Sequence, residues 1–331
     1  MRVAAVVVAA GKGTRFGSRD AKALERLSGE PLLVHSARAM AESGVVDRIV
    51  TVAPADRIEE FEGILRAVPL GRASDSPEKT AEPAKGAADG PGRAAETIGG
   101  DAGPIEIDVV GGGRTRQESV ARGLDRVFEA YGPDAGSDCV LIHDAARPLV
   151  PGAVIRRVVD ALAAGHPAVV PALPVADTIK RVERIADGGR ARLGASLGGS
   201  GAGAAENESE KAGSGAEACG NGAEKTGRGG AASGGEADAG LERVVETHDR
   251  TLLRAMQTPQ GFHLDAILRA HRDFAEKGEE EASAAPDDAA LVEAAGLPVV
   301  LVRGSERSMK ITRPIDLAIA QLLADDPSLG V

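Results

Sequence analysis

A glycine loop followed by cations is the first stretch of this chain that could do chemistry. Residues 9–17 read Ala-Ala-Gly-Lys-Gly-Thr-Arg-Phe-Gly, and Lys22 follows them. The loop comes directly after a β-branched apolar run at residues 3–8, which predicts a strand buried on both faces. Glycines let backbone N–H groups approach phosphate oxygens closely, and Arg15 and Lys22 supply positive charge. The stretch therefore predicts a site for a polyanionic phosphate.

Two well-known phosphate-binding loops do not fit this stretch. The dinucleotide fingerprint G-x-G-x-x-G fails at its third glycine, where Phe16 stands, so a dinucleotide oxidoreductase is a poor interpretation. The P-loop closes with G-K-[ST], whereas Gly-Lys-Gly opens the motif here. What the stretch resembles is the G-x-G-x-R…K signature of nucleoside-triphosphate transferases that activate sugars and polyols.

Composition and charge argue against several classes of partner. A net charge of −11 disfavours nucleic acid and anionic membranes, and a chain with no Trp and one Tyr lacks platforms for stacking unpaired bases. Cys139 and Cys219 lie far apart, which indicates neither a disulfide framework nor a CxxC metal site. We reject a signal peptide because only Arg2 precedes the apolar run, and no apolar stretch approaches membrane-spanning length. We therefore expect a soluble cytoplasmic protein.

The elements that must position the glycine loop alternate between strand and helix. Apolar runs predict strands at residues 3–8, 45–53, 105–110, 139–142, 168–173, 299–302 and 309–311. Amphipathic or capped segments predict helices starting near residues 31, 55, 114, 152, 264, 287 and 314. This order favours an α/β fold with a mostly parallel, twisted sheet, right-handed crossovers and flanking helices.

Two low-complexity tracts interrupt this order within what we expect to be a single domain, residues 1–331. About residues 71–104 and about 187–240 are rich in small residues and charge, so we expect disordered insertions. The second insertion separates strand-like runs at 177–183 and 241–248, which would pair as a hairpin without it. We therefore expect this second insertion to lie at the tip of a protruding β-arm, residues 174–250.

Three polar segments follow predicted strands and should meet at the carboxyl edge of the sheet: the glycine loop, Gly112-Gly113-Arg114, and His143-Asp144. Asp144 is a natural Mg²⁺ ligand, because Mg²⁺ takes one or two carboxylates plus phosphate oxygens and water. The alternative for Asp144 is a turn or helix cap. We interpret His143 as structural and Arg116 as the start of its helix.

Six cations beside glycines, strand ends or prolines are candidates for a phosphate pocket in this acidic protein. They are Arg15, Lys22, Arg147, Lys180, Arg250 and Lys310. A phosphate monoester is already a competent nucleophile, so nucleotidyl transfer to it needs positioning and charge neutralisation rather than a nucleophile triad. The sequence offers cations and Asp144, and no evident triad.

Six motifs in order resemble the 2-C-methyl-D-erythritol 4-phosphate cytidylyltransferases of the non-mevalonate isoprenoid pathway. They are residues 9–22 (Ala9, Ala10, Gly11, Arg15, Lys22), 112–120 (Gly-Gly-Arg-Thr-Arg-Gln-Glu-Ser-Val), 143–148 (His-Asp-Ala-Ala-Arg-Pro), 177–180 (Asp-Thr-Ile-Lys), 258–260 (Thr-Pro-Gln) and 310–314 (Lys-Ile-Thr-Arg-Pro). The resemblance spans nearly the whole chain outside the two insertions. It implies a Rossmann-like nucleotidyltransferase fold, a homodimer that interlocks through β-arms, and Mg²⁺-dependent transfer of CMP from CTP with release of pyrophosphate.

The resemblance also implies roles for individual residues. By motif, Arg15 and Lys22 would stabilise charge on the α-phosphate, while Arg250 and Lys310 would position the attacking phosphate. The nucleotide would be bound by Ala9, Ala10, Gly11, Gly13, Gly112, Gly113 and Ser119. The polyol phosphate would be bound by Asp144, Arg147, Thr178 and Thr258, with Asp144 also holding Mg²⁺. Thr178 and Arg250 lie on the predicted arm, so by analogy they would reach the partner subunit's site.

One departure and two alternatives stay open. The family usually carries Thr before Asp287-Asp288, and Pro286 stands there, which puts one substrate contact in doubt. A ribitol 5-phosphate cytidylyltransferase would share most of the nucleotide motifs, although residues 143–147 look closer to the methylerythritol family. A non-catalytic nucleotide-binding protein would not need Arg15, Lys22, Arg250, Lys310 and Asp144 together.

Overall fold

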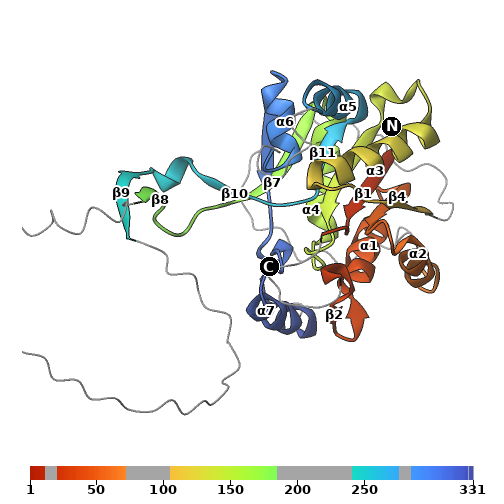
Figure 1. The fold of residues 1–331 in the computed structure, drawn as a ribbon, viewed down its shortest axis with the longest axis horizontal. Helices are drawn as coiled ribbons and strands as arrows, with labels where there is room; N and C mark the ends of the chain where they lie inside the picture. Colours follow the sequence, from red (N-terminus) through yellow and green to blue (C-terminus); the bar gives the residue numbers. More distant parts are fainter. Residues whose placement is uncertain (12–20, 72–104, 185–240, 276–284, 327, 331) are drawn as a thin grey trace, which may run out of the picture. The chain divides into compact units, whose positions relative to one another are not determined.

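The computed structural model describes residues 1–11, 21–71, 105–184, 241–275, 285–326 and 328–330 (Figure 1). These residues form two compact units. The first comprises residues 1–175 and 253–331, and the second comprises residues 176–252. The expected insertions lie outside the described residues, apart from Gly71 at the start of the first. None of the described helices is both long enough and apolar enough to cross a membrane.

A mixed, mostly parallel sheet of eight strands forms the centre of the first unit. The strands are β1 (Val3–Val8), β4 (Arg48–Ala53), β5 (Glu106–Gly111), β6 (Cys139–Asp144), β7 (Ala168–Pro174), β10 (Arg254–Met256), β11 (Gln260–His263) and β12 (Val299–Arg303). Their order is β10-β7-β11-β6-β1-β4-β5, with β12 also paired to β7. β6, β1, β4 and β5 run parallel, and β11 is antiparallel to both β6 and β7. The carboxyl ends of these four parallel strands therefore share one edge, as predicted.

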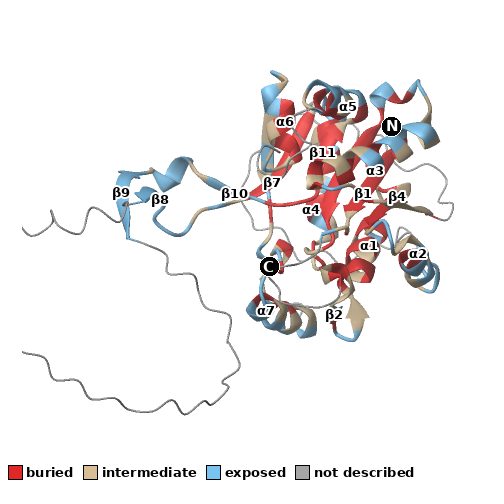
Figure 2. Cartoon of the chain, in the orientation of Figure 1, coloured by how far each residue is buried: buried red, intermediate tan, exposed pale blue. Residues whose placement is uncertain are grey.

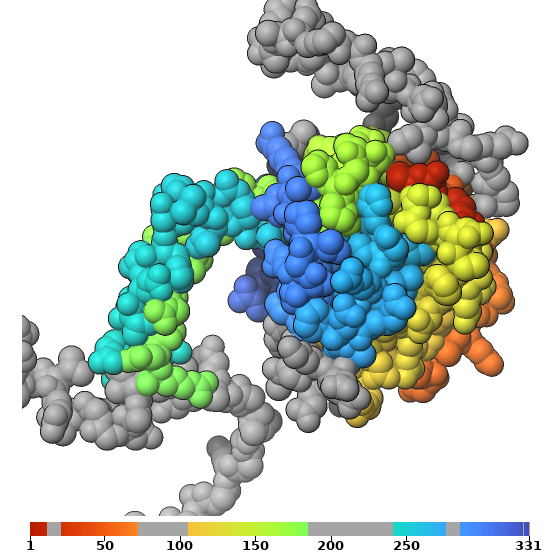
Figure 3. Space-filling model, turned by 90° about the horizontal axis from the view of Figure 1, so that it is seen from above, coloured from red at the N-terminus to blue at the C-terminus, as the bar shows by residue number. Residues whose placement is uncertain are grey.

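Helices cover both faces of this sheet because its strands are apolar on both faces. Along β1, Val3, Ala5 and Val7 join one buried cluster, whereas Ala4 and Val6 join the other. The first cluster packs against α1 (Leu32–Glu42), α2 (Ile58–Arg66) and α4 (Gly152–Ala163). The second packs against α3 (Arg116–Tyr131), α5 (Leu264–Asp273) and α6 (Asp288–Ala294). Figure 2 shows the buried strands between these layers, and Figure 3 shows α6 (blue), α5 (lighter blue) and α3 (yellow) next to one another.

Short elements complete the first unit. β2 (Arg26–Leu27) and β3 (Glu30–Pro31) form a small hairpin, preceded by the 3-10 helix η2 (Lys22–Leu24). α7 (Pro314–Asp325) packs around the buried residues Leu27, Leu32 and Ile311.

The strand predicted at 309–311 is wrong: these residues follow the 3-10 helix η7 (Glu306–Ser308), and the N–H of Ile311 donates to the carbonyl oxygen of Ala146 at 2.9 Å. The alternating apolar pattern there reflects burial of a loop and not strand pairing.

The second unit contains a two-stranded hairpin. β8 (Lys180–Arg184) pairs antiparallel with β9 (Glu242–Thr247), with an irregularity between Arg181 and Val182. This confirms the predicted pairing of the two runs on either side of the insertion. The 3-10 helix η5 (Arg250–Leu252) ends the unit.

Two glycines in helices test how closely the helices pack. A Cβ on Gly123 of α3 would lie 2.5 Å from Cγ1 of Val6 and 3.0 Å from Cγ2 of Val52, whereas a Cβ on Gly63 of α2 would meet nothing within 4 Å. We expect Gly123→Ala to lower the free energy of unfolding by about 1–3 kcal/mol through overpacking. Gly63→Ala should raise it by about 0.5–1 kcal/mol, because Gly is a poor helix former. Urea unfolding measures both, and a Gly123→Ala variant as stable as the wild type would contradict this packing.

Candidate functional site

The carboxylate of Asp144 lies at the carboxyl end of β6, and three cations surround it. Nζ of Lys310 lies 2.7 Å from Oδ2, and Nε of Arg147 lies 4.0 Å from the same oxygen. Nη2 of Arg116 lies 3.7 Å from Oδ1. Burial alone would raise the pKa of Asp144, but Arg116, Lys310 and Arg147 hold this pKa well below its usual range. The carboxyl group is therefore ionised at neutral pH.

A buried threonine and a buried histidine fix the end of β6. The N–H of Asp144 donates to Oγ1 of Thr258 at 3.2 Å, and that oxygen lies 3.0 Å from Nδ1 of His143. Nε2 of His143 lies 3.2 Å from the carbonyl oxygen of Arg147. Complete burial lowers the pKa of His143 to about 4, so its ring is neutral at physiological pH. This supports the interpretation of His143 as structural, and it gives Thr258 a role in holding Asp144.

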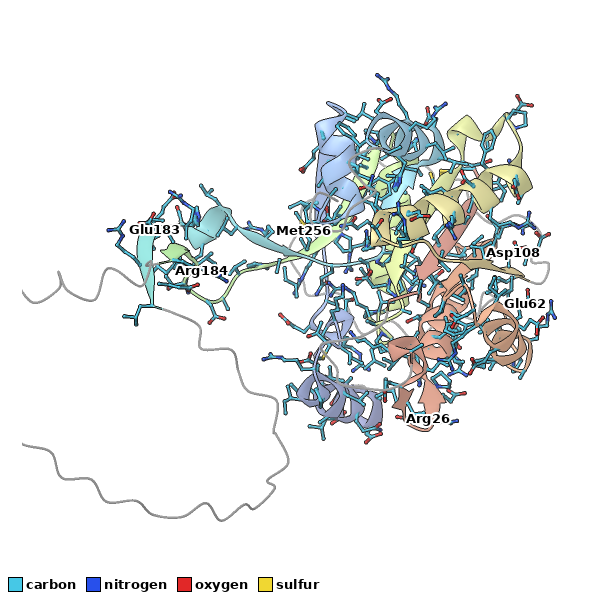
Figure 4. The ribbon with its side chains drawn as sticks, in the orientation of Figure 1. Arg26, Glu62, Asp108, Glu183, Arg184 and Met256 are labelled. Atoms are coloured by element: carbon cyan, nitrogen blue, oxygen red, sulfur yellow. The ribbon has the colours of Figure 1, made fainter. Side chains whose placement is uncertain are left out.

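Arg147 joins the loops around Asp144. Its Nη1 donates to the carbonyl oxygen of Ser308 at 2.6 Å, and its Nη2 donates to that of Met256 at 3.3 Å (Met256 is labelled in Figure 4). The Arg147 side chain is 12% exposed, and these hydrogen bonds engage its guanidinium group with backbone carbonyls. The Lys310 side chain is 43% exposed, so its ammonium group remains accessible to a ligand while it contacts Asp144.

Arg116 makes an ion pair that the sequence did not indicate. Its Nη2 lies 2.8 Å from Oδ2 of Asp288, the first residue of α6. Asp288 is 1% exposed, and its Oδ1 lies 3.4 Å from Nε2 of His271. Burial would lower the pKa of Arg116, but the neighbouring carboxylates of Asp288 and Asp144 raise it above its usual range. Arg116 does begin α3, as predicted, and it also belongs to this site.

The predicted nucleotide-binding residues of the two glycine segments lie close together. The N–H of Ala9 donates to the carbonyl oxygen of Val52, and that of Gly112 to the carbonyl oxygen of Ala53. A Cβ on Gly112 would lie 2.5 Å from the Cβ of Ala10, so the two segments touch through small residues. Glycine at position 112 is required here because any side chain would push them apart.

Ser119 secures the second glycine segment. Its Oγ accepts from the N–H of Gly113 at 3.0 Å and donates to the carbonyl oxygen of Thr115 at 2.8 Å. Thr115 caps α3, because its Oγ1 accepts from the N–H of Glu118 at 3.1 Å. The two hydrogen bonds of the Ser119 hydroxyl therefore give this residue a role in shaping the loop.

The remaining predicted residues are distributed as follows. Lys22 begins η2, and Gly11 is exposed at the end of the first described segment. Arg15 and Gly13 lie outside the described residues. Thr178 and Arg250 belong to the second unit, where the Arg250 guanidinium donates to the carbonyl oxygen of Ala176.

Comparisons with known proteins agree on one family. A sequence model of IspD, 2-C-methyl-D-erythritol 4-phosphate cytidylyltransferase, matches residues 3–73, 91–192 and 235–325. A protein of that name from Streptomyces avermitilis is 37% identical over 320 residues, which cover 97% of this chain and 90% of the relative. A protein of the same name from Streptomyces coelicolor is also 37% identical, over 97% of this chain and 84% of the relative.

The chain belongs to this family. It is therefore a nucleotidyltransferase by family, and the resemblance predicted from the six motifs is confirmed. The crystal structure of 4-diphosphocytidyl-2C-methyl-D-erythritol synthase from Anaerococcus prevotii has a TM-score of 0.58 to this chain at 20% identity, covering 98% of this chain and 99% of that one. That likeness confirms the predicted Rossmann-like α/β fold.

The neutral, buried His143 predicts a pH dependence of stability. An unfolded histidine has a pKa of about 6.5, whereas His143 in the folded chain has a pKa of about 4. As the pH falls below about 6.5, the unfolded chain therefore binds a proton that the folded chain does not, and stability decreases. This one group should lower the free energy of unfolding by about 2 kcal/mol between about pH 7 and about pH 5.

Urea unfolding at the two pH values measures this effect in the wild type and in His143→Asn. The variant should lose most of this dependence. The matched control is His166→Gln, because His166 is exposed and its replacement should leave the dependence in place. An unchanged pH dependence in His143→Asn would show that His143 is not the source of this loss of stability.

Proposed function

We propose that this chain transfers the cytidylyl group of CTP to the phosphate of 2-C-methyl-D-erythritol 4-phosphate. A phosphate oxygen of the polyol forms a bond to the α-phosphorus of CTP, and the bond between the α-phosphorus and the bridging oxygen breaks to release pyrophosphate. The observation that carries this proposal is the juxtaposition of Asp144 and the accessible ammonium group of Lys310 at the carboxyl end of β6. Membership of the family supports the choice of both substrates.

The chain's own residues contribute positioning and charge. The small residues at Ala9, Ala10, Gly112 and Gly113 would let backbone groups approach the nucleotide, and Ser119 would hold their loop. Arg15 and Lys22 would stabilise charge that grows on the α-phosphate, which lowers the barrier only if the contact strengthens in the transition state. Lys310 and Arg250 would orient the attacking phosphate, with Arg147, Thr258 and Thr178 beside it.

Asp144 is the carboxylate that would hold magnesium here, and the ion would share its oxygens with Lys310 and Arg116, which lie 2.7 and 3.7 Å from them. The described residues contain no group of three or more His, Cys, Asp or Glu side chains that could hold a metal on their own. Mg²⁺ commonly binds through one or two carboxylates together with phosphate oxygens and water, so an ion that arrives with CTP needs only one protein carboxylate. The depressed pKa of Asp144 keeps that carboxylate ionised. When bound, the ion would neutralise charge on the triphosphate.

We further propose a homodimer that forms through the hairpin of the second unit. Its strands expose apolar side chains that a single chain leaves in water: Val182 is 42% exposed and Val244 is 54% exposed. In such a dimer Thr178 and Arg250 of one subunit would serve the site of the other. Because both proposed substrates are small water-soluble anions, we place the reaction in the cytoplasm.

Pyrophosphate release with CTP and Mg²⁺ tests the proposed reaction, with methylerythritol 4-phosphate and ribitol 5-phosphate compared as acceptors. We expect release with the first and little with the second. This comparison is needed because the exposed Pro286 stands where the family usually carries Thr. Pyrophosphate release with ribitol 5-phosphate alone would show that this polyol phosphate is the acceptor. No release with either acceptor, in a chain that binds CTP, would refute the proposal.

Replacing Lys22 tests the transition-state role. We expect Lys22→Ala to lower kcat by about 100-fold or more while CTP affinity changes much less, because the lost contact would be strongest in the transition state. Steady-state kinetics and calorimetric titration with CTP measure the two effects. The control is Arg66→Ala, since the Arg66 side chain is 78% exposed on α2. Equal losses of affinity and turnover would contradict the assignment.

A further inference from the structure

Arg116 lies between two carboxylates that come from different elements. Its Nη2 is 2.8 Å from Oδ2 of Asp288 and 3.7 Å from Oδ1 of Asp144. Asp144 in turn meets Lys310 through its other oxygen, Oδ2, at 2.7 Å. Charges of alternating sign therefore run from the accessible Lys310 through Asp144 and Arg116 to the buried Asp288.

Asp288 cannot move easily, because the start of α6 is fastened to β11. The side chain of Gln260 in β11 makes two hydrogen bonds to this end of α6. Its Nε2 donates to Oδ2 of Asp287 at 2.8 Å, and its Oε1 accepts from the N–H of Ala289 at 3.2 Å. Asp287 also caps α6, with Oδ1 accepting from the N–H of Ala290 at 3.0 Å. A carboxylate on so constrained a backbone fixes the position of the guanidinium group that it binds.

A purely structural role does not account for this arrangement well. Burying two carboxylates and most of a guanidinium side chain costs desolvation energy that ion pairing often only offsets, so apolar side chains at the same positions could serve stability equally well. The arrangement does something that apolar side chains cannot. It places a guanidinium charge 3.7 Å from Oδ1 of Asp144, while Oδ2 makes its shortest contact with Lys310, at 2.7 Å.

We propose that Arg116 and Asp288 are positioning residues for the cytidylyl transfer proposed above, on which this inference rests. Asp288 holds Arg116, Arg116 orients the carboxylate of Asp144, and Asp144 places the ammonium group of Lys310 where the attacking phosphate must bind. Neither Arg116 nor Asp288 needs to contact a substrate in this account. Removing the pair should therefore slow turnover and leave CTP binding intact.

The test combines Arg116→Met with Asp288→Asn. Either replacement alone would remove the 2.8 Å partner of the remaining charge and destabilise the chain, whereas the double variant removes both charges. The matched control is Arg2→Met with Asp138→Asn. Nη2 of Arg2 lies 2.5 Å from Oδ2 of Asp138, whose side chain is 8% exposed. The two residues precede β1 and β6, so they lie at the amino ends of these strands, away from the site at the carboxyl ends.

Three measurements decide the proposal. The double variant should show a kcat about 100-fold lower than wild type, because small misplacements cost that much, with KM for CTP within about twofold. Its melting temperature should lie within a few degrees of the wild type, as should that of the control variant, which keeps its turnover. In a crystal structure of the double variant, Lys310 should no longer lie within hydrogen-bond distance of Oδ2 of Asp144.

Several outcomes would overturn the proposal. Wild-type kcat in the double variant would show that the pair is structural only, and a raised KM for CTP at retained kcat would show that Arg116 contacts the nucleotide. An unchanged contact between Lys310 and Asp144 in the crystal structure would also refute it. If the wild type releases no pyrophosphate, the proposed function fails, and the crystal structure alone still decides whether the pair positions Lys310.

Discussion

The constraint on which this site depends is an ionised carboxylate held in a buried position. A charge removed from water must be paired, and Asp144 is paired by Lys310 at 2.7 Å, with Arg116 at 3.7 Å and Arg147 at 4.0 Å. These cations lie on separate segments of the chain, so one carboxylate ties the start of α3 and the loops after β6 and η7 to the end of β6. The same pairing that satisfies Asp144 places positive charge where a phosphate would bind.

The sheet supplies the common edge at which these segments meet. β6, β1, β4 and β5 are parallel, so the segments that follow their carboxyl ends are brought together. Contact between Ala10 and Gly112 is possible only because both residues are small. β11 lies antiparallel beside β6. Thr258, just before β11, accepts a hydrogen bond from the N–H of Asp144, and Gln260, the first residue of β11, bonds to the start of α6.

Apolar runs predict the parallel strands, and amphipathic or capped segments predict the α-helices, because each of these elements carries a local pattern that it buries or caps. Such patterns could not predict β10 and β11, whose short segments around Thr258 and Pro259 carry no alternation long enough to recognise. The ion pair of Arg116 with Asp288 was missed for a different reason. Arg116 stands at a helix start, which is a sufficient local explanation, and no local pattern indicates a partner far along the chain. The sequence singled out Asp144 by its place at a strand end and Lys310 as one of six candidate cations, but their direct contact appears only in the structure.

The role of this carboxylate is decided by the turnover number of Asp144→Asn, with the fold of the variant checked by thermal unfolding. Asn keeps the shape of the side chain and removes the charge that organises Lys310 and Arg116. We expect a folded protein that binds CTP and whose kcat is lower by about 100-fold or more. A folded Asp144→Asn variant with wild-type turnover would contradict the claim that this carboxylate organises the site.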